Sequence, residues 1–525
     1  MPRKPKYIPV IDLFAGPGGL GEGFSRWPMG KDKQFKILLS VEKDRYAHQT
    51  LTLRAFFRQF EECQVPNAYY EYVKGKISLD ELFSQFPEQA LAAQEEAQQL
   101  TLGQHDVSSL IGRRLNGRKN WVLIGGPPCQ AYSLVGRSRM TGGTKLEGES
   151  EEDFQRRIHQ RRSQFDQDHR HHLYKEYLKI IGDHWPPVFV MENVKGILSA
   201  KVNGELIFPQ ILQDLSSPAK ALNRRPRIKY EYKIYSFSTE ALDGDWTRLS
   251  PSDYLIRSEK YGIPQARHRV ILFGVRSDKK LRDIPVLAKL EPSTVRETIG
   301  TLPKLAAGLT GRSKDSQVEV LGSIKSADWW MELNEIPELR SVKRRMENEL
   351  GQLKVHGNGG GRFVKSLRMH SDEWFYDPHL GGTLNHEARD HMKEDLWRYF
   401  FCSCYAKEFP GKSPKLKDFP DSLLPAHKNV GEAVSGGKFG DRFRVQLENR
   451  AATTVTSHIS KDGHYFIHYD PRQCRSLTVR EAARLQTFPD NYFFEGPRTA
   501  QFHQVGNAVP PRLAYQIAGI VAGII

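Results

Sequence analysis

The stretch YIPVIDLFAGPGGLGEGF, residues 7–24, decides the fold of this chain. Its apolar run up to Phe14 predicts a buried strand, the glycines of Gly16–Gly21 predict a tight turn, and the following residues continue as a helix. A second apolar run, Phe35–Val41, ends at Glu42, at about the distance where nucleotide-binding folds place an acid on ribose hydroxyls. Such a glycine pattern also occurs in turns that bind no ligand, so the presence of Glu42 is the evidence that favours a nucleotide site over a purely structural turn. Together they predict a βαβ nucleotide site.

Three further apolar runs, at residues 121–124, 187–191 and 270–275, are predicted strands. Residues 51–100 are rich in helix formers and indicate a helical insertion, while the charged stretch 145–170 is typical of a solvated amphipathic helix. Strands that alternate with helices predict a doubly wound α/β domain, with site residues at the carboxyl ends of the strands.

The sequence changes character over residues 277–473. The periodic spacing of apolar residues weakens there, glycines cluster, and basic residues are interleaved with aromatic ones, as in Phe439–Arg444. We therefore predict an α/β domain formed by residues 1–276 and 474–525, and a second, smaller domain formed by residues 277–473. The charge and aromatic content of the second domain suits contacts to phosphates and bases. The alternative is a loop-rich insertion without a binding role.

The composition limits the classes of protein that need consideration. Of 525 residues, 77 are Lys or Arg and 62 are Asp or Glu, which gives a net charge of +15. Such an excess favours a polyanionic partner, although many soluble proteins are basic without one. The apolar stretch Leu513–Ile525 is shorter than the roughly 20 residues that span a bilayer. No cleavage pattern follows the basic N-terminus, so we expect neither a membrane segment nor an export signal.

The cysteines are too few and too scattered for a disulfide framework, which favours a reducing, intracellular setting. They are Cys63, Cys129, Cys402, Cys404 and Cys474. Cys402 and Cys404 lack the matching second pair of a structural zinc site. His386 and His391 are five residues apart, so they would not share a helix face as metalloprotease ligands do. We therefore expect no metal.

Six blocks, in an unpermuted order, resemble the DNA (cytosine-5) methyltransferase family. They are Asp12–Gly19, Gly126–Gln130, Glu192–Val194, Gln265–Arg269, Leu477–Pro489 and Gln504–Asn507. The resemblance covers residues 7–276 and 470–525. It implies a Rossmann-like, S-adenosylmethionine-dependent methyltransferase domain with a target-recognition domain at 277–473 that reads double-stranded DNA.

The resemblance also implies the catalytic residues. Carbon 5 of cytosine is a weak nucleophile, so Cys129 would first add to carbon 6, and the thiol, with a pKa near roughly 8.5, must lose its proton for this step. Glu192, in its acid form, would donate to N3. Arg269, supported by Arg267, would contact cytosine O2 and steady the carboxylate. The base must leave the duplex for this chemistry. The group that removes the carbon-5 proton is left open.

S-adenosylmethionine is the implied methyl donor, and S-adenosylhomocysteine is the product. The sulfonium cation of S-adenosylmethionine favours a binding site lined by aromatic and acidic side chains. Glu42 would accept from the ribose hydroxyls and Asp106 from the adenine amino group. The residues implied to line the donor site are Asp12, Phe14, Ala15, Gly16, Gly18, Gly19, Glu42, Asp106, Pro128, Asn507 and Ala508.

Basic and polar residues in two regions are the candidate DNA contacts. Those in the loop after Cys129 are Ser133, Arg137 and Arg139, and those in the second domain are Arg442, Arg444 and Lys461. Thr454-Val455 resembles a dipeptide of the family's recognition region. The recognition sequence itself is left open.

No regulatory domain precedes Asp12, so we expect a prokaryotic modification enzyme of a restriction-modification or related phage-defence system. It would work in the cytoplasm, associated with the nucleoid, as a monomer on DNA, with other proteins of that system as further partners. Three alternatives compete: a tRNA cytosine-5 methyltransferase, a nicotinamide-dependent oxidoreductase and a non-catalytic DNA-binding module. The oxidoreductase leaves Cys129 and the Gln265–Arg269 block unexplained.

Overall fold

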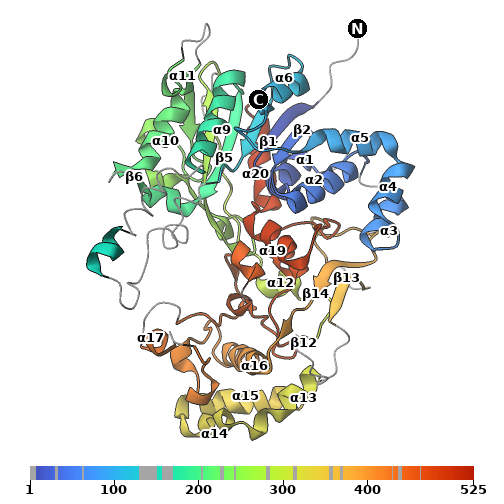
Figure 1. Ribbon diagram of the computed structural model, residues 1–525, viewed down its shortest axis with the longest axis vertical. Helices are drawn as coiled ribbons and strands as arrows, with labels where there is room; N and C mark the ends of the chain where they lie inside the picture. Colours follow the sequence, from blue (N-terminus) through green and yellow to red (C-terminus); the bar gives the residue numbers. More distant parts are fainter. Residues whose placement is uncertain are drawn as a thin grey trace.

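The computed structural model describes most of the chain. The described residues are 7–29, 34–61, 64–128, 150–156, 170–202, 205–224, 230–241, 244–279, 284–310, 316–353, 359–366, 370–427, 430–435, 440–461 and 463–525. They form an upper lobe around a large sheet and a lower lobe of helices (Figure 1).

The sheet of the upper lobe has eight strands among the described residues, in the order β3-β2-β1-β4-β5-β11-β8, with β9 also paired to β11. The strands are β1 (Ile8–Leu13), β2 (Phe35–Glu42), β3 (Ala97–Gln99), β4 (Val122–Gly125), β5 (Val188–Val194), β8 (Tyr232–Tyr235), β9 (Leu255–Arg257) and β11 (His268–Arg276). The first five strands of this order are parallel, whereas β11 runs antiparallel to β5, β8 and β9.

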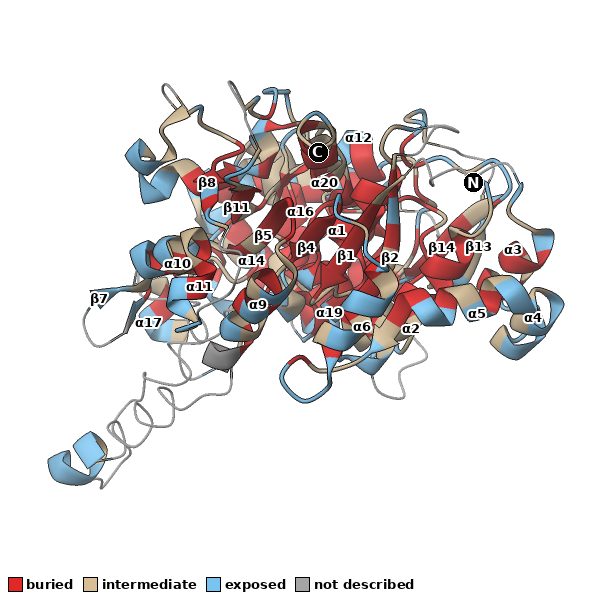
Figure 2. Ribbon diagram, turned by 90° about the horizontal axis from the view of Figure 1, so that it is seen from above, coloured by how far each residue is buried: buried red, intermediate tan, exposed pale blue. Residues whose placement is uncertain are grey.

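Helices cover both faces of this sheet, which confirms the predicted doubly wound α/β class. On one face lie α6 (Val107–Leu115), α9 (Arg170–His184) and α10 (Ile207–Ser216), and on the other lie α1 (Gly19–Ser25) and α20 (Pro511–Ala522). Side chains alternate along each strand: Ile11 of β1 packs into the first layer and Val10 into the second. Figure 2 shows the buried strands between the two layers.

Two strands extend further than the sequence predicts. Strand β5 continues through Glu192–Val194, and β11 begins at His268. Their antiparallel ladder pairs Val194 with Arg269, so it carries both strands two or three residues beyond their apolar runs. Pairing between distant strands has no local sequence signal, which explains the difference.

The predicted helical insertion is present beside the outer edge of the sheet. Its helices are α2 (Arg45–Phe57), α3 (Asn67–Val73), α4 (Leu79–Gln85) and α5 (Pro87–Glu96). They share a core with the hairpin of β13 (Gly360–Lys365) and β14 (Gly382–Glu387), through Leu380 and Leu384. Of the stretch predicted as a solvated charged helix, residues 151–156 are helical, and residues 145–149 and 157–169 lie outside the described part.

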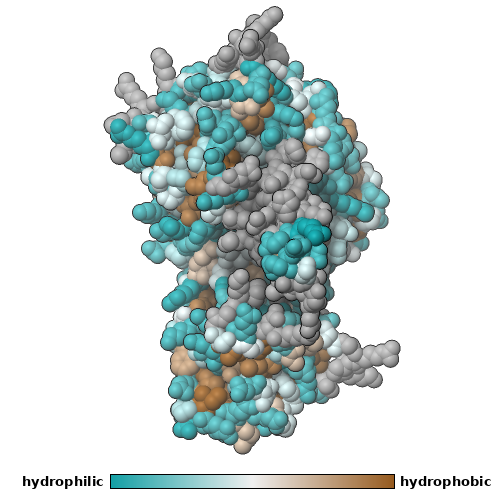
Figure 3. Space-filling view, turned by 60° about the vertical axis from the view of Figure 1, so that its left-hand side comes forward, coloured by the Kyte–Doolittle hydropathy of each residue, from teal (hydrophilic) through white to brown (hydrophobic). Residues whose placement is uncertain are grey.

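The lower lobe has a hydrophobic core of its own. It is built from α13 (Gln317–Gly322), α14 (Asp328–Glu335), α15 (Arg340–Leu350), α16 (Lys393–Glu408) and α17 (Val430–Val434). The buried side chains of α16, such as Leu396 and Phe400, lie in this core, which Cys474 also joins. Apolar side chains gather on part of its surface, whereas the rest of the face in view is mostly hydrophilic (Figure 3). The domain limits at residues 277 and 473 stay a prediction.

A third group of elements joins the lobes. It contains α12 (Val295–Ile299), α18 (Val479–Leu485) and α19 (Arg498–Asn507), whose buried side chains form one cluster. Smaller elements are α11 (Pro218–Ala221) and the strand pairs β6 (Lys201–Val202) with β7 (Glu205–Leu206), β10 (Gln265–Ala266) with β16 (Ala452–Thr453), and β12 (Gly308–Leu309) with β15 (Asp390–His391). Among the described residues, no helix combines the length and the apolar character that crossing a membrane requires.

We predict that Gly23→Ala destabilises the protein, because α1 and α20 touch at this glycine. A Cβ at Gly23 would lie 2.4 Å from both the Cβ of Ala514 and the carbonyl oxygen of Pro511. Overpacking of this kind costs about 1–3 kcal/mol. Thermal unfolding should show a lower midpoint than the wild type. The control is Gly322→Ala, a helical glycine whose added Cβ meets nothing within 4 Å and should leave the midpoint unchanged or slightly raised. Equal midpoints for the two variants would contradict the close α1–α20 contact.

Candidate active site

The predicted site residues come from neighbouring strand ends. Leu13 of β1 pairs with Gly125 of β4, which in turn pairs with Met191 of β5. On the other side of β1, Leu13 pairs with Val41 of β2. These four parallel strands therefore end at the same side of the sheet, their carboxyl edge. The segments that follow β1 and β4 lie there beside the last residues of β2 and β5.

The turn after β1 has an unusual backbone. Phe14, Gly16 and Gly18 all have positive φ, at 57°, 57° and 92°. For Phe14 this conformation is rare and costs on the order of 1–3 kcal/mol, so surrounding contacts must hold it. A Cβ added to Gly19 would lie 2.2 Å from the carbonyl oxygen of Val509, so the turn packs directly on the segment before α20.

Glu42 closes one side of this turn. Its carboxylate accepts hydrogen bonds from the backbone N–H groups of Gly16 at 2.9 Å, Lys43 at 2.9 Å and Asp44 at 2.8 Å. Burial raises the pKa of Glu42, and these N–H donors oppose the shift. A carboxylate has about four acceptor sites, so one remains for a ligand. Phe14 is only half-buried, and an added Cβ on Gly16 would meet nothing within 4 Å, so the turn is open beside this acid.

Asp12 lies beneath the turn and not at its open side. The residue is fully buried, and burial raises the pKa of its carboxyl to about 8, with Arg58 opposing the shift and Glu42 adding to it. It faces α1, since a Cβ added to Gly21 would lie 3.0 Å from its carboxylate. The predicted role of Asp12 at the donor site would therefore act through the turn.

Glu192 and Arg269 form an ion pair at the same edge. Arg269 Nε lies 2.8 Å from Glu192 Oε1, and about a tenth of each side chain is exposed. Burial lowers the pKa of Arg269, and Glu192 opposes the shift. The segment after β4 lies against this pair, since a Cβ on Gly126 would be 3.0 Å from the Glu192 carboxylate. Asn193 holds the same segment by donating to the Pro127 carbonyl at 3.3 Å.

The predicted nucleophile itself, Cys129, lies outside the described residues, as do Ser133, Arg137 and Arg139. The structure describes the segment that leads to Cys129 up to Pro128, which is half-buried. The part of the chain that approaches Cys129 is thus beside Glu192.

The Arg267 side chain forms its hydrogen bonds with residues other than Glu192. It is buried and donates from Nη1 to the carbonyl of Val455 at 2.7 Å and from Nη2 to the carbonyl of Gly506 at 3.0 Å. Burial, together with neighbouring Arg269, lowers its pKa well below the usual range for arginine. Arg267 therefore links its own segment to the segments around Val455 and Gly506, which are far from it in the sequence.

Sequence reasoning missed two residues that support this link. The Gln265 side chain donates to Gln486 at 3.0 Å and accepts from the Val455 N–H at 2.8 Å. The Ser258 hydroxyl donates to the carbonyl of Arg267 at 2.7 Å. Gln265 is part of a block that the sequence singled out, so a signal existed, whereas nothing in the sequence marks Ser258.

The other predicted donor-site residues have varied surroundings. Asp106 is exposed and caps α6 by accepting from the Ser109 N–H at 3.0 Å. Asn507, the last residue of α19, is exposed, while Ala508 is buried. Their contacts with a donor stay a prediction.

The predicted DNA contacts in the second domain lie near the junction of the lobes. The Arg444 guanidinium pairs with Asp441 and lies 5.7 Å from the centre of the Tyr465 ring. Arg442 is half-buried and Lys461 is exposed. All three come from residues 440–461, which contain Val455, the partner of Arg267.

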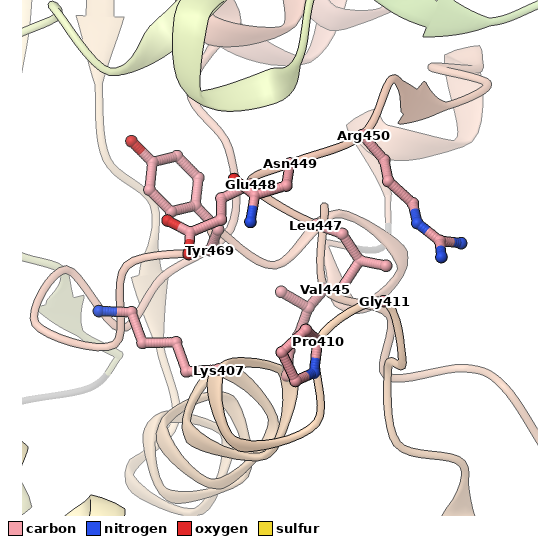
Figure 4. A pocket seen from close by; sticks show the side chains of 10 residues that line it. Lys407, Pro410, Gly411, Val445, Leu447, Glu448, Asn449, Arg450 and Tyr469 are labelled. Atoms are coloured by element: carbon pink, nitrogen blue, oxygen red, sulfur yellow. The ribbon is translucent and has the colours of Figure 1, made fainter.

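The lower lobe also contains a pocket of about 220 Å³ beside the end of α16. Figure 4 shows the apolar side chains of Pro410, Val445 and Leu447 gathered in its lining. None of its lining residues belongs to the predicted site.

Three of the cysteines lie among the described residues. Cys402, Cys404 and Cys474 are buried free thiols, and Cys474 donates to the Leu396 carbonyl at 2.9 Å. Within the described ranges, no group of three or more His, Cys, Asp and Glu side chains is placed to hold a metal ion.

Comparison with known proteins identifies the relatives of this chain. The model of the C-5 cytosine-specific DNA methylase family matches residues 97–218 and 252–522. The type II methyltransferase M.Bpa9945I of Bacillus paralicheniformis is 32% identical, over 98% of this chain and 99% of that protein. The type II methyltransferase M.AgeI of Thalassovita gelatinovora is 26% identical, over 97% and 98%. The DNA (cytosine-5-)-methyltransferase M.ApeKI of Aeropyrum pernix is 26% identical, over 82% and 87%.

We predict that Asp12→Asn makes the protein less sensitive to alkaline pH. The Asp12 pKa is raised from 3.8 to about 8 in the folded chain, so folding binds a proton, and stability falls as pH rises between these values. Asparagine keeps the shape without the charge. The unfolding midpoint of the variant, relative to the wild type, should therefore increase between about pH 5.5 and pH 8.5. The control is Asp106→Asn, whose carboxyl has a lowered pKa and keeps one charge state over that interval. Parallel pH profiles for Asp12→Asn and the wild type would refute the raised pKa.

Proposed function

The chain belongs to the C-5 cytosine-specific DNA methylase family and is a DNA (cytosine-5-)-methyltransferase, and on that premise we propose that it methylates a flipped-out cytosine through a covalent adduct with Cys129. The observation that carries the proposal is the Glu192–Arg269 ion pair, which lies against the segment that leads to Cys129. A duplex hides both faces of a cytosine, so the base has to leave the stack to reach this edge of the sheet.

The covalent steps use groups of this chain. The Cys129 thiolate adds to carbon 6 of the ring, and Glu192 places a proton at N3 as electron density builds up there. Arg269 stays charged, holds the Glu192 carboxyl by their 2.8 Å contact and can donate to cytosine O2. After carbon 5 carries the new methyl group, a base removes the remaining proton from carbon 5, and the electron pair of that C–H bond forms the carbon 5–carbon 6 double bond as Cys129 leaves as a thiolate. N3 returns its proton to Glu192, which restores the neutral aromatic ring.

Arg267 acts one step away from this chemistry. Both hydrogen bonds of its side chain go to backbone carbonyls, those of Val455 and Gly506, and these bonds support the strand that carries Arg269. We therefore propose that Arg267 positions Arg269 and does not touch the base.

The family implies S-adenosylmethionine as the methyl donor, and the turn after β1 fits this molecule. The turn is open at Gly16, offers the half-buried Phe14 ring and carries the remaining acceptor site of Glu42 for a ribose hydroxyl. The sulfonium of the donor supplies an electrophilic methyl group. Phe14 and Glu42 provide the aromatic and acidic surround that a cation favours.

The lower lobe would read the DNA sequence, with Arg442, Arg444 and Lys461 as phosphate or base contacts. The relatives M.Bpa9945I and M.AgeI are named type II methyltransferases. By analogy, we propose that this chain marks host DNA as self in a restriction-modification or related phage-defence system. It would act as a monomer on nucleoid DNA beside the other proteins of that system.

We predict that expression of this chain in a methylation-deficient bacterial host protects cytosines in one short sequence context. Conversion sequencing of genomic DNA measures this directly. Cys129→Ser should abolish protection while DNA binding by purified protein is kept. Glu192→Gln should reduce the rate by about 10²–10⁴-fold, because the proton at N3 is lost. Protection that persists in Cys129→Ser would refute the covalent mechanism. Unmodified DNA, with wild-type protein that binds the donor, would direct attention to RNA as the substrate.

We predict that Lys461→Ala weakens binding to every DNA duplex by a similar factor. If Lys461 neutralises one phosphate, the slope of log K against log salt should fall by about 1. Fluorescence anisotropy at several salt concentrations measures this slope. The matched control is Lys36→Ala. Lys36 is an exposed lysine near the amino end of β2, whereas the site lies at the carboxyl ends of the strands. A salt slope that is unchanged in Lys461→Ala would remove this residue from the interface.

A further inference from the structure

The glycine turn rests on two side chains that are far from it in sequence. The Tyr492 hydroxyl donates to the carbonyl of Pro17, in the middle of the turn. A Cβ added to Gly18 would lie 3.0 Å from the same hydroxyl oxygen and 2.8 Å from Cδ2 of Leu51 on α2. Tyr492 is fully buried, so it forms the floor of the turn and lies on the side away from the open face at Gly16.

Arg54 of α2 holds this floor in place. Its guanidinium lies 4.8 Å from the centre of the Tyr492 ring and donates from Nη1 to the Asn491 side chain at 3.0 Å. Its Nε donates to Glu22 of α1 at 2.9 Å, in a buried pair. Burial works against the charged carboxylate, but Arg54 lowers the pKa of Glu22 to about 2, so the pair stays ionised. One arginine thus ties α2, α1 and the residue next to Tyr492.

Further contacts leave Tyr492 little freedom to move. Asn491 donates to Asp377 at 2.7 Å, and its carbonyl accepts from the Tyr69 hydroxyl at 3.0 Å. The Tyr492 carbonyl accepts from the buried guanidinium of Arg480 at 2.5 Å. Asn491 and the backbone of Tyr492 are therefore both held by hydrogen bonds.

We infer that Tyr492 is a positioning residue for the methyl donor, because its hydroxyl holds the Pro17 carbonyl and with it the conformation of the turn. The inference rests on the proposed donor site at this turn. The backbone at Phe14, Gly16 and Gly18 lies in the positive-φ region, and such a conformation persists only where neighbours over-determine it. Without the hydroxyl, the turn would sample other conformations, and donor binding would have to select one of them.

A matched pair of variants separates this role from ordinary stability. Tyr492→Phe keeps the ring and its stacking on Arg54 but removes the bond to Pro17. Tyr254→Phe is the control, since Tyr254 is also buried and its hydroxyl donates to a single backbone carbonyl, that of Ile234, at 2.9 Å. Ile234 lies in β8, at the far end of the sheet from the turn. Each variant removes one buried bond from a hydroxyl to a carbonyl.

The experiment measures binding of S-adenosylhomocysteine to the full-length protein by calorimetry, with thermal unfolding and duplex DNA binding beside it. Tyr492→Phe should weaken binding of this ligand about 10-fold, the effect of one hydrogen bond that is lost from a fixed conformation. Tyr254→Phe should bind the ligand like the wild type. Both variants should lower the unfolding midpoint to a similar extent and bind duplex DNA as the wild type does. In turnover measurements, Tyr492→Phe should raise KM for the donor more than it lowers kcat.

Ligand binding by Tyr492→Phe within about 2-fold of the wild type would overturn the inference. Equal weakening in both variants would overturn it too, because the effect would then follow stability alone. If Tyr492→Phe does not fold, Arg54→Lys serves as the second variant. It keeps the cation beside Glu22 but lacks the fork that reaches Asn491, so it should also weaken ligand binding. Wild-type protein that binds no ligand would instead refute the proposed donor site.

Discussion

A buried arginine with few possible partners constrains the whole site. Arg267 is 1% exposed, and a buried guanidinium has to find acceptors for its N–H groups. Its acceptors are the carbonyls of Val455 and Gly506, 188 and 239 residues further along the chain. Arg267 therefore holds three segments together at one point. They are the strand that carries Arg269, the segment around Val455, which lies between the candidate DNA contacts Arg444 and Lys461, and the end of α19. The Glu192–Arg269 pair depends on this arrangement.

Buried charges are common throughout the junction of the lobes. Arg475 forms two 2.7 Å hydrogen bonds with Glu481, and Arg484 pairs with Asp490 at 2.7 Å. Arg480 binds three backbone carbonyls. Such groups add little net stability relative to apolar packing, but the loss of one partner is costly. We therefore interpret them as groups that select one arrangement of the loops, including the segment that carries Tyr492.

Much of the upper lobe could be predicted from local patterns. The run before Phe14 and the run at 35–41 are buried strands, and both face two layers of helices, so their continuous apolar character was informative. The lower lobe was harder, because most of the helices in its core are short and because nine consecutive or nearly consecutive residues of α16 are buried, Asp395 and Arg398 among them, so that the helix shows no single apolar face. The β13–β14 hairpin was not foreseen at all. It packs on α2–α5, where Arg362 donates to the carbonyl of Val73, and no local pattern reports a contact between residues 289 positions apart.

The sequence by itself determined the family of this protein and with it the proposed chemistry, because the ordered blocks around Cys129, Glu192 and Arg269 carry the side chains that the proposed reaction needs. It also determined the class of fold through the period of its apolar residues. Only the tertiary structure decided what each side chain does. Arg267 and Arg269 are two residues apart and chemically identical, yet the Arg267 side chain donates to the carbonyls of two distant residues, whereas the Arg269 side chain pairs with Glu192 and donates to the carbonyl of its neighbour His268. The physical reason is that the partner of a buried polar group is set by which distant segments fold against it, and the sequence does not record that proximity.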